Sequence, residues 1–421
     1  MSESQIATLE GRIPELMAQA NVAGLSVALV ENAAVAWARG FGLKDAAAGE
    51  RVTPKTVFQA ASLSKPVFAY AVLKARAEGL LDLDTPLSAY LPEPYIPGDP
   101  RLERITARHV LGHTAGLPNW RPKDQPLRIH FPAGERFAYS GEGYVYLQRV
   151  VEHLSGQPFD AWMRARLLDP LGMHHSSYVW RDTYETQAAR GHDREGKVKE
   201  LRRMQEPNAA YSLYTTAPEF ARFVSALLQP PDDPACLTVK QVAHMLAPQV
   251  PANDAGFHAE RPTSEVRTDE RVSWGLGWGL QPAPGGEAFW HWGDNGDFHT
   301  FVMGFPRLKT GMVCLANGER GRALWTNLFG LAFGGEQPAI AWLSDLYGDG
   351  QKSGGEEASA MTAAQVAAYL RLHPLTVRRL AREGTLPAHK EGRQWRIERA
   401  DLERWIAERT QSRDSPCASQ S

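Results

Sequence analysis

Apolar residues near the start of the chain follow helical spacing and then change to strand-like runs. Residues three or four positions apart predict an amphipathic helix: Leu9, Ile13, Leu16 and Met17. The apolar runs 25–30 and 34–41 predict two strands, with a turn at residues 31–32 between them. The chain is therefore expected to begin with a helix and a hairpin.

A second helix is predicted from about residue 62 to Gly79. Its buried stripe repeats at helical spacing: Val67, Phe68, Ala71, Val72 and Ala75. Pro66 fits the first turn of this helix, where proline is tolerated, and Gly79 is a typical helix end. Residues 80–270 then alternate short helices with loops rich in Pro and Gly.

Strand-like runs return in the last third of this region. They are Ser273–Leu280, Ala288–Trp292, Thr300–Phe305 and Gly311–Asn317. A helical segment over residues 324–346 follows. Because strands stand at both ends of a mostly helical middle, we expect one antiparallel sheet flanked by helices, with a helical domain inserted, in the α+β (α/β sandwich) class.

Composition excludes few function classes, but it constrains the expected partners and the location of the protein in the cell. The 421 residues carry a net charge of -2, which gives no overall attraction to nucleic acid or membrane. Three cysteines are too few for a disulfide framework or a metal knuckle. No apolar run is long enough to span a bilayer, and the N-terminus lacks the layout of a secretory signal. We therefore expect a cytoplasmic protein that does not enter membranes.

The C-terminal part has a different composition. Residues 349–360 are polar and glycine-rich, which predicts a linker after a large domain at 1–348. Residues 361–410 hold ten Lys and Arg against six acids, so this segment carries +4 and the remainder -6. Residues 411–421 are expected to be a disordered tail.

Residues 361–410 also carry helix and wing signals. Thr362 with Gln365 has the spacing of a capping box. Pro374 is well placed to open a second helix, which is expected to end at Gly384. A two-stranded wing over 390–397 and a last helix from residue 401 complete this unit.

Ser62 and Lys65, in the run Ser62-Leu63-Ser64-Lys65, are the first candidates for catalysis. Residues three apart on a helix share a face, so the two side chains can meet. A serine hydroxyl becomes a nucleophile when a base takes its proton, and lysine can be that base if burial lowers its pKa. Because chance places roughly one S-x-x-K in a chain of this length, the pair needs support from other segments.

Three further segments accompany the pair in order along the chain. They are Ile105–Pro118, which leads from a helix into a loop, Phe137–Gly141, which precedes a helix, and Trp290–Asp294, which ends a strand. Together with Phe58–Lys65, they resemble the serine β-lactamase and penicillin-binding protein superfamily. The resemblance is strongest to its class C-like branch, with family VIII esterases and D-amino-acid peptidases, and it implies the β-lactamase/transpeptidase-like fold.

The resemblance also implies roles for individual residues. Ser62 would be the acylated nucleophile, Lys65 would share its proton, and Tyr139 would be a second acid/base with its pKa lowered by the lysine. The backbone N–H groups of Ser62 and Asp294 would form the oxyanion hole. The wall of the site opposite the serine would be His291, Trp292 and Gly293. No metal and no organic cofactor is implied.

Two departures from the family pattern bear on the substrate. Gly141 stands where many members have an asparagine that contacts an acylamino side chain. His291 and Trp292 replace the Lys-Thr that helps to hold a substrate carboxylate, and a histidine is largely neutral at pH 7. Both changes weaken recognition of a β-lactam or a D-Ala-D-Ala peptide and favour a less polar ester.

Three activities remain open on this basis. A carboxylesterase acting on small or medium acyl esters is favoured. The first alternative is a β-lactamase or D-aminopeptidase/DD-peptidase using the same site, on a small-molecule amide. The second is a transcriptional regulator whose hydrolase-like domain senses a ligand. The i,i+4 pair His109 and His113 lacks the Glu of a zinc motif and predicts loop scaffolding.

The basic C-terminal segment resembles an excisionase-type, MerR-like winged helix-turn-helix. This likeness rests on the runs 361–370, 395–397 and 402–406. Such a module places its second helix in the major groove of DNA. By that resemblance the DNA contacts would be Thr376, Arg378, Arg379 and, on the wing, Arg393. A single module of this size binds weakly, so a homodimer is expected if DNA is the partner.

Overall fold

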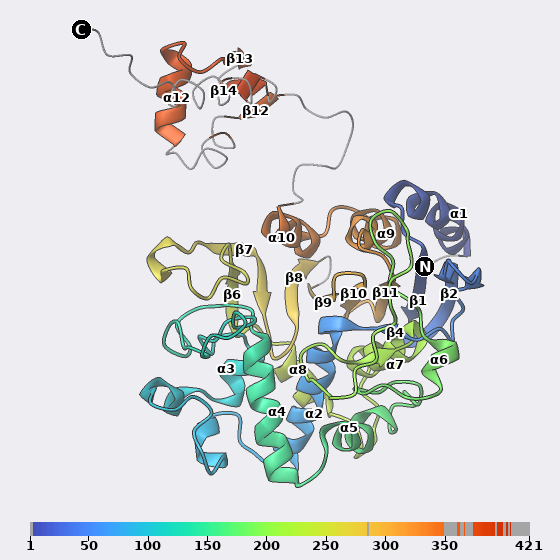
Figure 1. Cartoon of the computed structure of the whole chain (residues 1–421). Coiled ribbons are helices and arrows are strands. Elements are labelled where there is room, and N and C mark those ends of the chain that lie inside the picture. Colours follow the sequence, from blue (N-terminus) through green and yellow to red (C-terminus); the bar gives the residue numbers. More distant parts are fainter. Residues whose placement is uncertain are drawn as a thin grey trace. The chain divides into compact units, whose positions relative to one another are not determined.

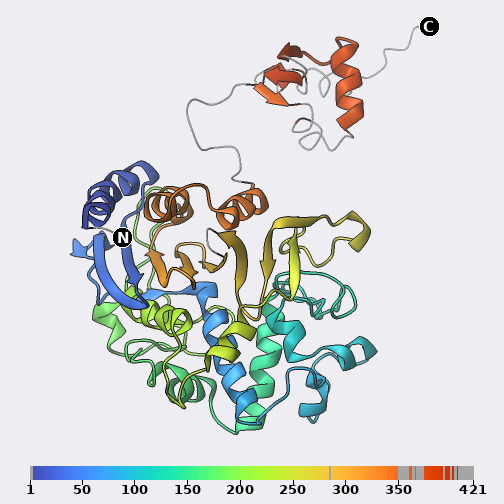
Figure 2. The same cartoon turned by 180° about the vertical axis from the view of Figure 1, so that it is seen from behind.

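The computed structural model describes residues 3–283, 286–348, 360–362, 366, 374–391, 394–398, 401–402 and 405. The chain divides into two compact units, 1–349 and 350–421, and each is described by itself. Figure 1 shows the elements of both, and Figure 2 shows them from behind.

A nine-stranded antiparallel sheet forms the centre of the first unit, in the order β3-β2-β1-β11-β10-β9-β8-β7-β6. Its N-terminal strands are β1 (Gly24–Glu31), β2 (Ala34–Asp45) and β3 (Glu50–Arg51). The others are β6 (Val250–Asn253), β7 (Thr268–Trp274), β8 (Gly279–Ala283), β9 (Gly286–Asp294), β10 (His299–Phe305) and β11 (Thr310–Ala316). As expected, both ends of the unit build one sheet, because β1 pairs directly with β11.

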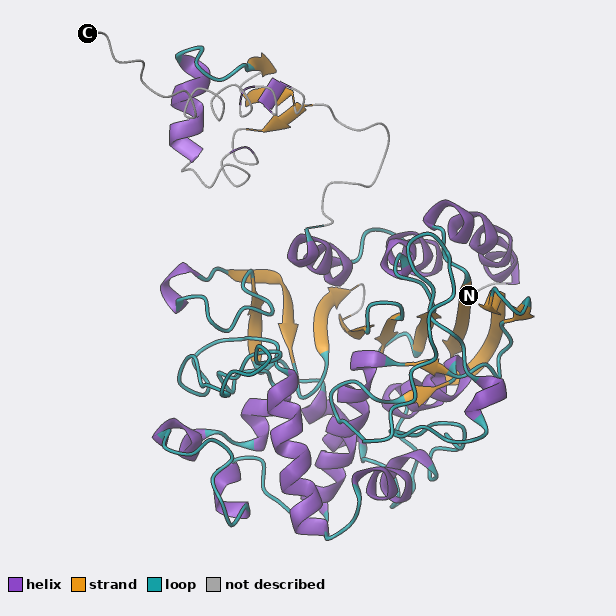
Figure 3. Ribbon diagram, viewed as in Figure 1, coloured by secondary structure: helices purple, strands orange, loops and turns teal. Residues whose placement is uncertain are grey.

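Helices cover both faces of this sheet, as Figure 3 shows. One face carries α1 (Glu3–Ala20), α9 (Trp325–Phe333) and α10 (Pro338–Tyr347). The core on the other side includes α2 (Ser64–Ala77), α3 (Ala107–Leu111), α4 (Gly141–Ser155), α5 (Phe159–Met163), α7 (Ala217–Leu228) and α8 (Val239–Met245). The short helix α6 (Tyr184–Gln187) packs in a separate small cluster. Strand side chains are therefore buried on both sides, which explains why β1 and β11 have nearly continuous apolar runs.

Shorter elements connect these layers. Two-residue strands β4 (Phe58–Gln59) and β5 (Tyr214–Thr215) pair with each other. Single helical turns lie at η1 (Ala61–Leu63), η2 (Leu87–Tyr90), η3 (Pro100–Arg104), η4 (Arg164–Leu168), η5 (Thr263–Glu265) and η6 (Gly321–Leu324). The helical middle of the sequence is thus a set of short pieces around α2 and α4.

Two predicted elements are wrong in their boundaries. The run 273–280 was expected to be one strand, but it crosses the turn between β7 and β8, where Gly277 has φ +89°. A Cβ on Gly277 would lie 2.4 Å from Ala69 Cβ, so the turn packs tightly against α2. The segment 324–346 is two helices, because Gly334 and Gly335 both have positive φ before Pro338 begins α10.

The second unit contains α12 (Pro374–Arg382) and a three-stranded sheet in the order β12-β14-β13. These strands are β12 (Ala360–Thr362), β13 (His389–Glu391) and β14 (Gln394–Glu398). The predicted wing is β13 and β14, which pair with each other. Thr362, expected to cap a helix, is in β12 opposite Arg396, and Gln365, the linker residues 350–359 and the tail 411–421 lie outside the described residues.

Candidate active site

The proposed nucleophile stands on a strained turn. Ser62 is the middle residue of η1, immediately before α2. Ala61 precedes it with φ +50°, a conformation that costs energy for a residue with a Cβ. Two contacts hold the turn: Ala60 N–H donates to Leu213 O (2.7 Å), and Thr300 Oγ1 donates to Ala60 O (2.9 Å). The hydroxyl is thus fixed at the start of the helix by segments far away in sequence.

Lys65 meets Ser62 as the spacing predicts. Its Nζ lies 3.0 Å from Ser62 Oγ and donates to Ala210 O at 2.8 Å. The side chain is fully buried, and this burial holds the pKa of Lys65 well below its usual value. A neutral amine keeps a lone pair, so Lys65 can donate to Ala210 O and still accept the Ser62 proton.

Tyr139 lies against this pair, but its pKa moves in the direction opposite to the expected one. Lys65 Nζ is 4.7 Å from the centre of the Tyr139 ring. Burial raises the pKa of Tyr139 well above its usual value, and the nearby Ser62 hydroxyl opposes this only in part. The expected lowering by lysine fails because the same burial pushes Lys65 toward its uncharged form. At neutral pH the phenol holds its proton, so it can donate one.

His113 supports Tyr139 from the loop after α3. Its Nδ1 accepts the backbone N–H of Ser140 at 3.0 Å, and its ring centroid lies 4.3 Å from that of Tyr139. This bond fixes the neutral tautomer with the proton on Nε2. Burial, with smaller effects of Lys65 and His291, keeps the pKa of His113 well below its usual value. The predicted scaffolding by this residue thus extends to the segment that carries Tyr139.

His291 is placed differently from the prediction. It was expected in the wall that faces the substrate, but its side chain is fully buried. Its Nδ1 lies 2.7 Å from Trp292 O, and burial lowers the pKa of His291 to about 3. It is therefore neutral and contributes no charge to hold a carboxylate.

Gly293 allows β9 to approach the nucleophile turn. A Cβ there would lie 2.3 Å from Thr300 Oγ1, 2.5 Å from Ala60 O and 2.9 Å from Ala61 Cβ. These distances are too short for any side chain, so only glycine fits. The close approach brings the next residue, Asp294, to the same cavity as Ser62.

Asp294 is ionised at this cavity. Burial would raise its pKa, but His299 and the backbone N–H of Gly296, with Arg322 nearby, together lower the pKa of Asp294 to about 2. His299 Nε2 is 3.3 Å from Asp294 Oδ1, and Arg322 Nη1 is 3.8 Å from Oδ2. The carboxylate is therefore partly balanced by cationic or polar neighbours.

A cavity of about 250 Å³ opens onto Ser62 and is mostly aromatic. Its lining is Ser62, Asn119, Trp120, Tyr139, Tyr211, Phe257, Trp292, Asp294, Asn295 and Tyr347. Of these, only Ser62, Tyr139, Trp292 and Asp294 were candidates from sequence. No lining residue is a Lys, Arg or His.

Trp120 occupies the space left by Gly141. A Cβ on Gly141 would lie 2.6 Å from the far edge of the Trp120 ring and 2.9 Å from Asn119 O. Trp120 is 45% exposed and its ring meets Tyr211 at 5.5 Å. The missing side chain of Gly141 therefore leaves room for the Trp120 ring. This ring lies where the family resemblance places an asparagine amide.

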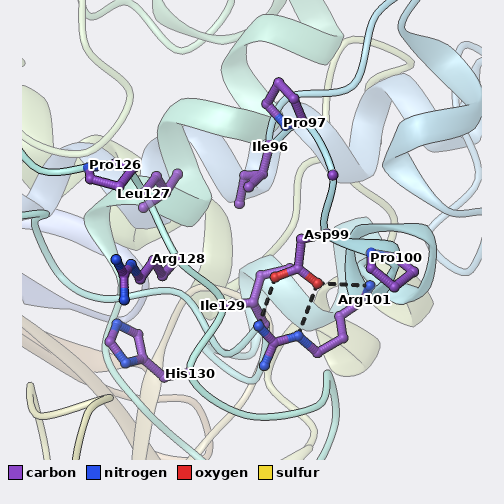
Figure 4. Close-up of a pocket in the computed structure, with 11 residues that line it drawn as sticks. Ile96, Pro97, Asp99, Pro100, Arg101, Pro126, Leu127, Arg128, Ile129 and His130 are labelled. Atoms are coloured by element: carbon purple, nitrogen blue, oxygen red, sulfur yellow. Dashed lines mark hydrogen bonds and ion pairs between the residues drawn. The ribbon is translucent and has the colours of Figure 1, made fainter.

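A second, larger hollow lies away from this chemistry. It measures about 840 Å³ and is lined by residues 96–101 and 126–130, as Figure 4 shows. Asp99 and Arg101 form an ion pair in it, with Oδ2 and Nη2 2.7 Å apart. Ser62, Lys65 and Tyr139 do not line this hollow. The larger of the two cavities is therefore not the one at the candidate catalytic residues.

Within the described parts of the chain, no three His, Cys, Asp or Glu side chains gather as metal ligands. His109 instead bonds with Thr106, which caps α3. Among the same residues, no helix combines the length and apolar character needed to cross a membrane.

In the second unit, α12 carries three of the four residues expected to contact DNA. Arg378 and Arg379 are exposed, and Thr376 is half-buried. Arg379 Nη1 pairs with Glu383 at 3.1 Å, one turn further on. Val377 is buried in a small core with Val366, Leu386, Ile397 and Leu402. Arg393 lies outside the described residues.

With this geometry in place, comparison with known proteins defines the family. A family model described as β-lactamase matches residues 9–330, and one described as a helix-turn-helix domain matches residues 360–410. The chain belongs to the β-lactamase family. It has the β-lactamase fold, followed by a C-terminal helix-turn-helix domain.

Individual relatives of this family member are distant. Protein flp of Staphylococcus aureus (strain MRSA252) is 24% identical over 337 residues, which cover 75% of this chain and 63% of flp. The chain thus matches less than two thirds of the length of that relative. A β-lactamase of Pseudomonas fluorescens is 25% identical over 288 residues, 66% of this chain and 74% of that protein.

Solved structures show the same fold. D-alanine carboxypeptidase AmpC from Burkholderia cenocepacia has a TM-score of 0.64 at 21% identity, covering 78% of this chain and 99% of that one. An octameric penicillin-binding protein homologue from Pyrococcus abyssi has a TM-score of 0.63 at 23% identity, covering 82% and 77%.

Proposed function

We propose that this protein is a serine hydrolase and, more narrowly, a carboxylesterase that acts on small or medium acyl esters through an acyl-enzyme at Ser62. The observation that carries the proposal is the lining of the cavity, which has aromatic rings around Ser62 and no Lys, Arg or His. A β-lactam or a D-Ala-D-Ala peptide presents a carboxylate. Burying that anion without a cationic partner is costly, whereas an uncharged ester gains from apolar contact.

The proposed reaction assigns one proton step to each central residue. Neutral Lys65 takes the Ser62 proton as Oγ attacks the ester carbonyl, and the backbone N–H groups of Ser62 and Asp294 stabilise the resulting oxyanion. Protonated Tyr139 gives its proton to the leaving alcohol, and the lysine proton restores the phenol. Water then attacks the acyl carbonyl of the acyl-enzyme, and its proton passes through the same residues to Ser62 Oγ as the bond between Oγ and the acyl carbon breaks. The acid is released and the free serine is restored.

The test is steady-state hydrolysis of p-nitrophenyl butyrate by the wild type beside Ser62→Ala, with a chromogenic cephalosporin as a parallel substrate. We expect ester turnover that Ser62→Ala abolishes, and a kcat/KM for the cephalosporin that is lower by orders of magnitude. Equal ester turnover by both proteins would refute the role of Ser62. Faster turnover of the cephalosporin would favour the β-lactamase alternative, which the P. fluorescens relative also suggests.

A DNA partner is proposed for the second unit, because a helix-turn-helix model matches it and α12 exposes Arg378 and Arg379. Such arginines contact phosphates or base edges. If the hydrolase domain serves only as a sensor, Ser62 should acylate once and remain acylated. Multiple turnovers per protein molecule, measured with p-nitrophenyl butyrate in excess, would exclude that alternative.

A further inference from the structure

The wall of the active-site cavity is nearly continuous in aromatic rings. Phe257 lies 5.7 Å from both Tyr139 and Trp292 and 5.4 Å from Tyr347, measured between ring centroids. Trp292 Nε1 donates to Tyr347 Oη at 2.9 Å, which fixes these two rings relative to each other. The faces of aromatic rings are electron-rich, so a wall of this kind attracts cations as well as apolar groups.

Asp294 is the one acid among the lining residues of this cavity. It lies beside Tyr347, whose ring also contacts the Arg322 guanidinium at 3.7 Å. Arg322 itself does not line the cavity, and its nearest nitrogen is 3.8 Å from the carboxylate. Asp294 is therefore the one residue with a formal charge among the lining residues of this cavity.

We infer that the cavity selects esters that carry a cationic ammonium group, with Asp294 and the rings of Trp120, Phe257 and Tyr347 around that group. This inference rests on the proposed esterase activity and names its substrate class. Ammonium groups are bound in other proteins by aromatic rings together with a carboxylate, for the same electrostatic reason. An anionic ester of equal size would face Asp294 and should be the poorest substrate.

The test compares three thioesters of the same acyl chain whose thiol release can be followed by colour. Butyrylthiocholine carries the cation, S-(3,3-dimethylbutyl) thiobutyrate replaces nitrogen by carbon at equal shape, and S-butyryl-3-mercaptopropionate carries an anion. We expect kcat/KM for the cationic thioester to exceed that for its neutral isostere about tenfold, as cation–π and carboxylate contacts allow. The anionic thioester should be slower than both.

Two variants test the residues behind the preference, and each is read as the ratio of cationic to neutral kcat/KM. Asp294→Asn should lower this ratio severalfold, whatever it does to the absolute rate. Arg322→Gln should raise the ratio, because it removes a positive charge that competes for the same carboxylate. A change of the oxyanion hole would slow both thioesters equally and leave the ratio unchanged.

Failure of the inference is distinct from failure of the esterase proposal. Equal kcat/KM for cationic and neutral thioesters in the wild type, or a faster anionic one, would overturn the ammonium preference while leaving the esterase standing. If the protein turned over neither the neutral thioester nor p-nitrophenyl butyrate, the esterase proposal itself would be overturned. The wild-type comparison decides the question even if a variant does not fold.

Discussion

Gly293→Ala is the substitution that tests the geometry of the site most directly. The added Cβ would lie 2.5 Å from Ala60 O, whereas ordinary contacts begin at 3.4 Å. The backbone of β9 and the nucleophile turn must therefore separate by about 1 Å. That separation moves the N–H of Asp294 away from the position of the oxyanion, while Ser62 of η1 and Lys65 of α2 remain together.

The expected loss can be estimated from this displacement. A misplacement of about 1 Å at a reacting centre costs roughly 100-fold in rate, and removing one oxyanion donor costs about 10²–10³. We therefore expect kcat for p-nitrophenyl butyrate to fall about 100-fold, equivalent to about 2.7 kcal/mol. The free energy of unfolding should fall by about 1–3 kcal/mol, as for other overpacked sites.

Gly304→Ala is the matched control for this experiment. Its Cβ would lie 2.3 Å from the Phe289 ring, so it overpacks the same sheet without touching the nucleophile turn. It should lose stability in thermal unfolding but keep kcat within about threefold. If Gly293→Ala folds and keeps its kcat, or if both variants lose kcat equally, the close approach of β9 to Ser62 does not matter for catalysis.

Three further predictions concern other residues. Lys65→Met should reduce kcat/KM at least 10³-fold; in the wild type, activity should fall on acidification through the lowered pKa of Lys65. The unfolded chain binds the Lys65 proton more tightly than the folded protein does. The free energy of unfolding should therefore rise with pH between the lowered pKa of Lys65 and its usual value, and in urea unfolding at several pH values Lys65→Met should lack this rise. Gly141→Asn alone should impair ester hydrolysis, because the new side chain meets the Trp120 ring. Adding Trp120→Ala to the same chain should restore part of the activity. No restoration would show that the barrier is Asn119 O, which lies 2.9 Å from the position of the added Cβ. Arg378→Ala should weaken DNA binding, measured by fluorescence anisotropy against salt, more than Arg379→Ala, whose guanidinium is paired with Glu383; a larger effect of Arg379→Ala would argue against this order.

Local spacing predicted those features of the site that depend on one element. Ser62, in η1, and Lys65, in α2, are three residues apart across the start of one helical segment, and this spacing brings their side chains together. The strands β1 and β11 were found because burial on both faces leaves a nearly continuous apolar run. The break between β7 and β8 was missed because the turn at Gly277 packs against Ala69 of α2. This is a tertiary contact, and the local sequence pattern does not contain it.

The chemistry that depends on tertiary burial could not be predicted. The alternation of side chains along a strand does not tell which face of β9 is exposed to water. In the folded chain the His291 side chain is fully buried. Trp120 fills the space beside Gly141 from a loop about twenty residues earlier, and nothing in its own segment marks it. The predicted direction of the Tyr139 pKa was wrong for a related reason: the prediction assumed a charged lysine, and burial disfavours that charge while it raises the pKa of Tyr139.

One physical cause accounts for the state of the whole cluster around Ser62. Lys65, His113, His291 and Tyr139 are all buried, and burial favours the uncharged form of each. Burial therefore works against charge throughout this centre, whereas the pKa of Asp294, at the cavity, is lowered to about 2. A substrate carboxylate would meet no opposite charge among the lining residues. We therefore expect the lack of a cationic wall, rather than any feature of Ser62 or Lys65, to favour uncharged esters over substrates that carry a carboxylate.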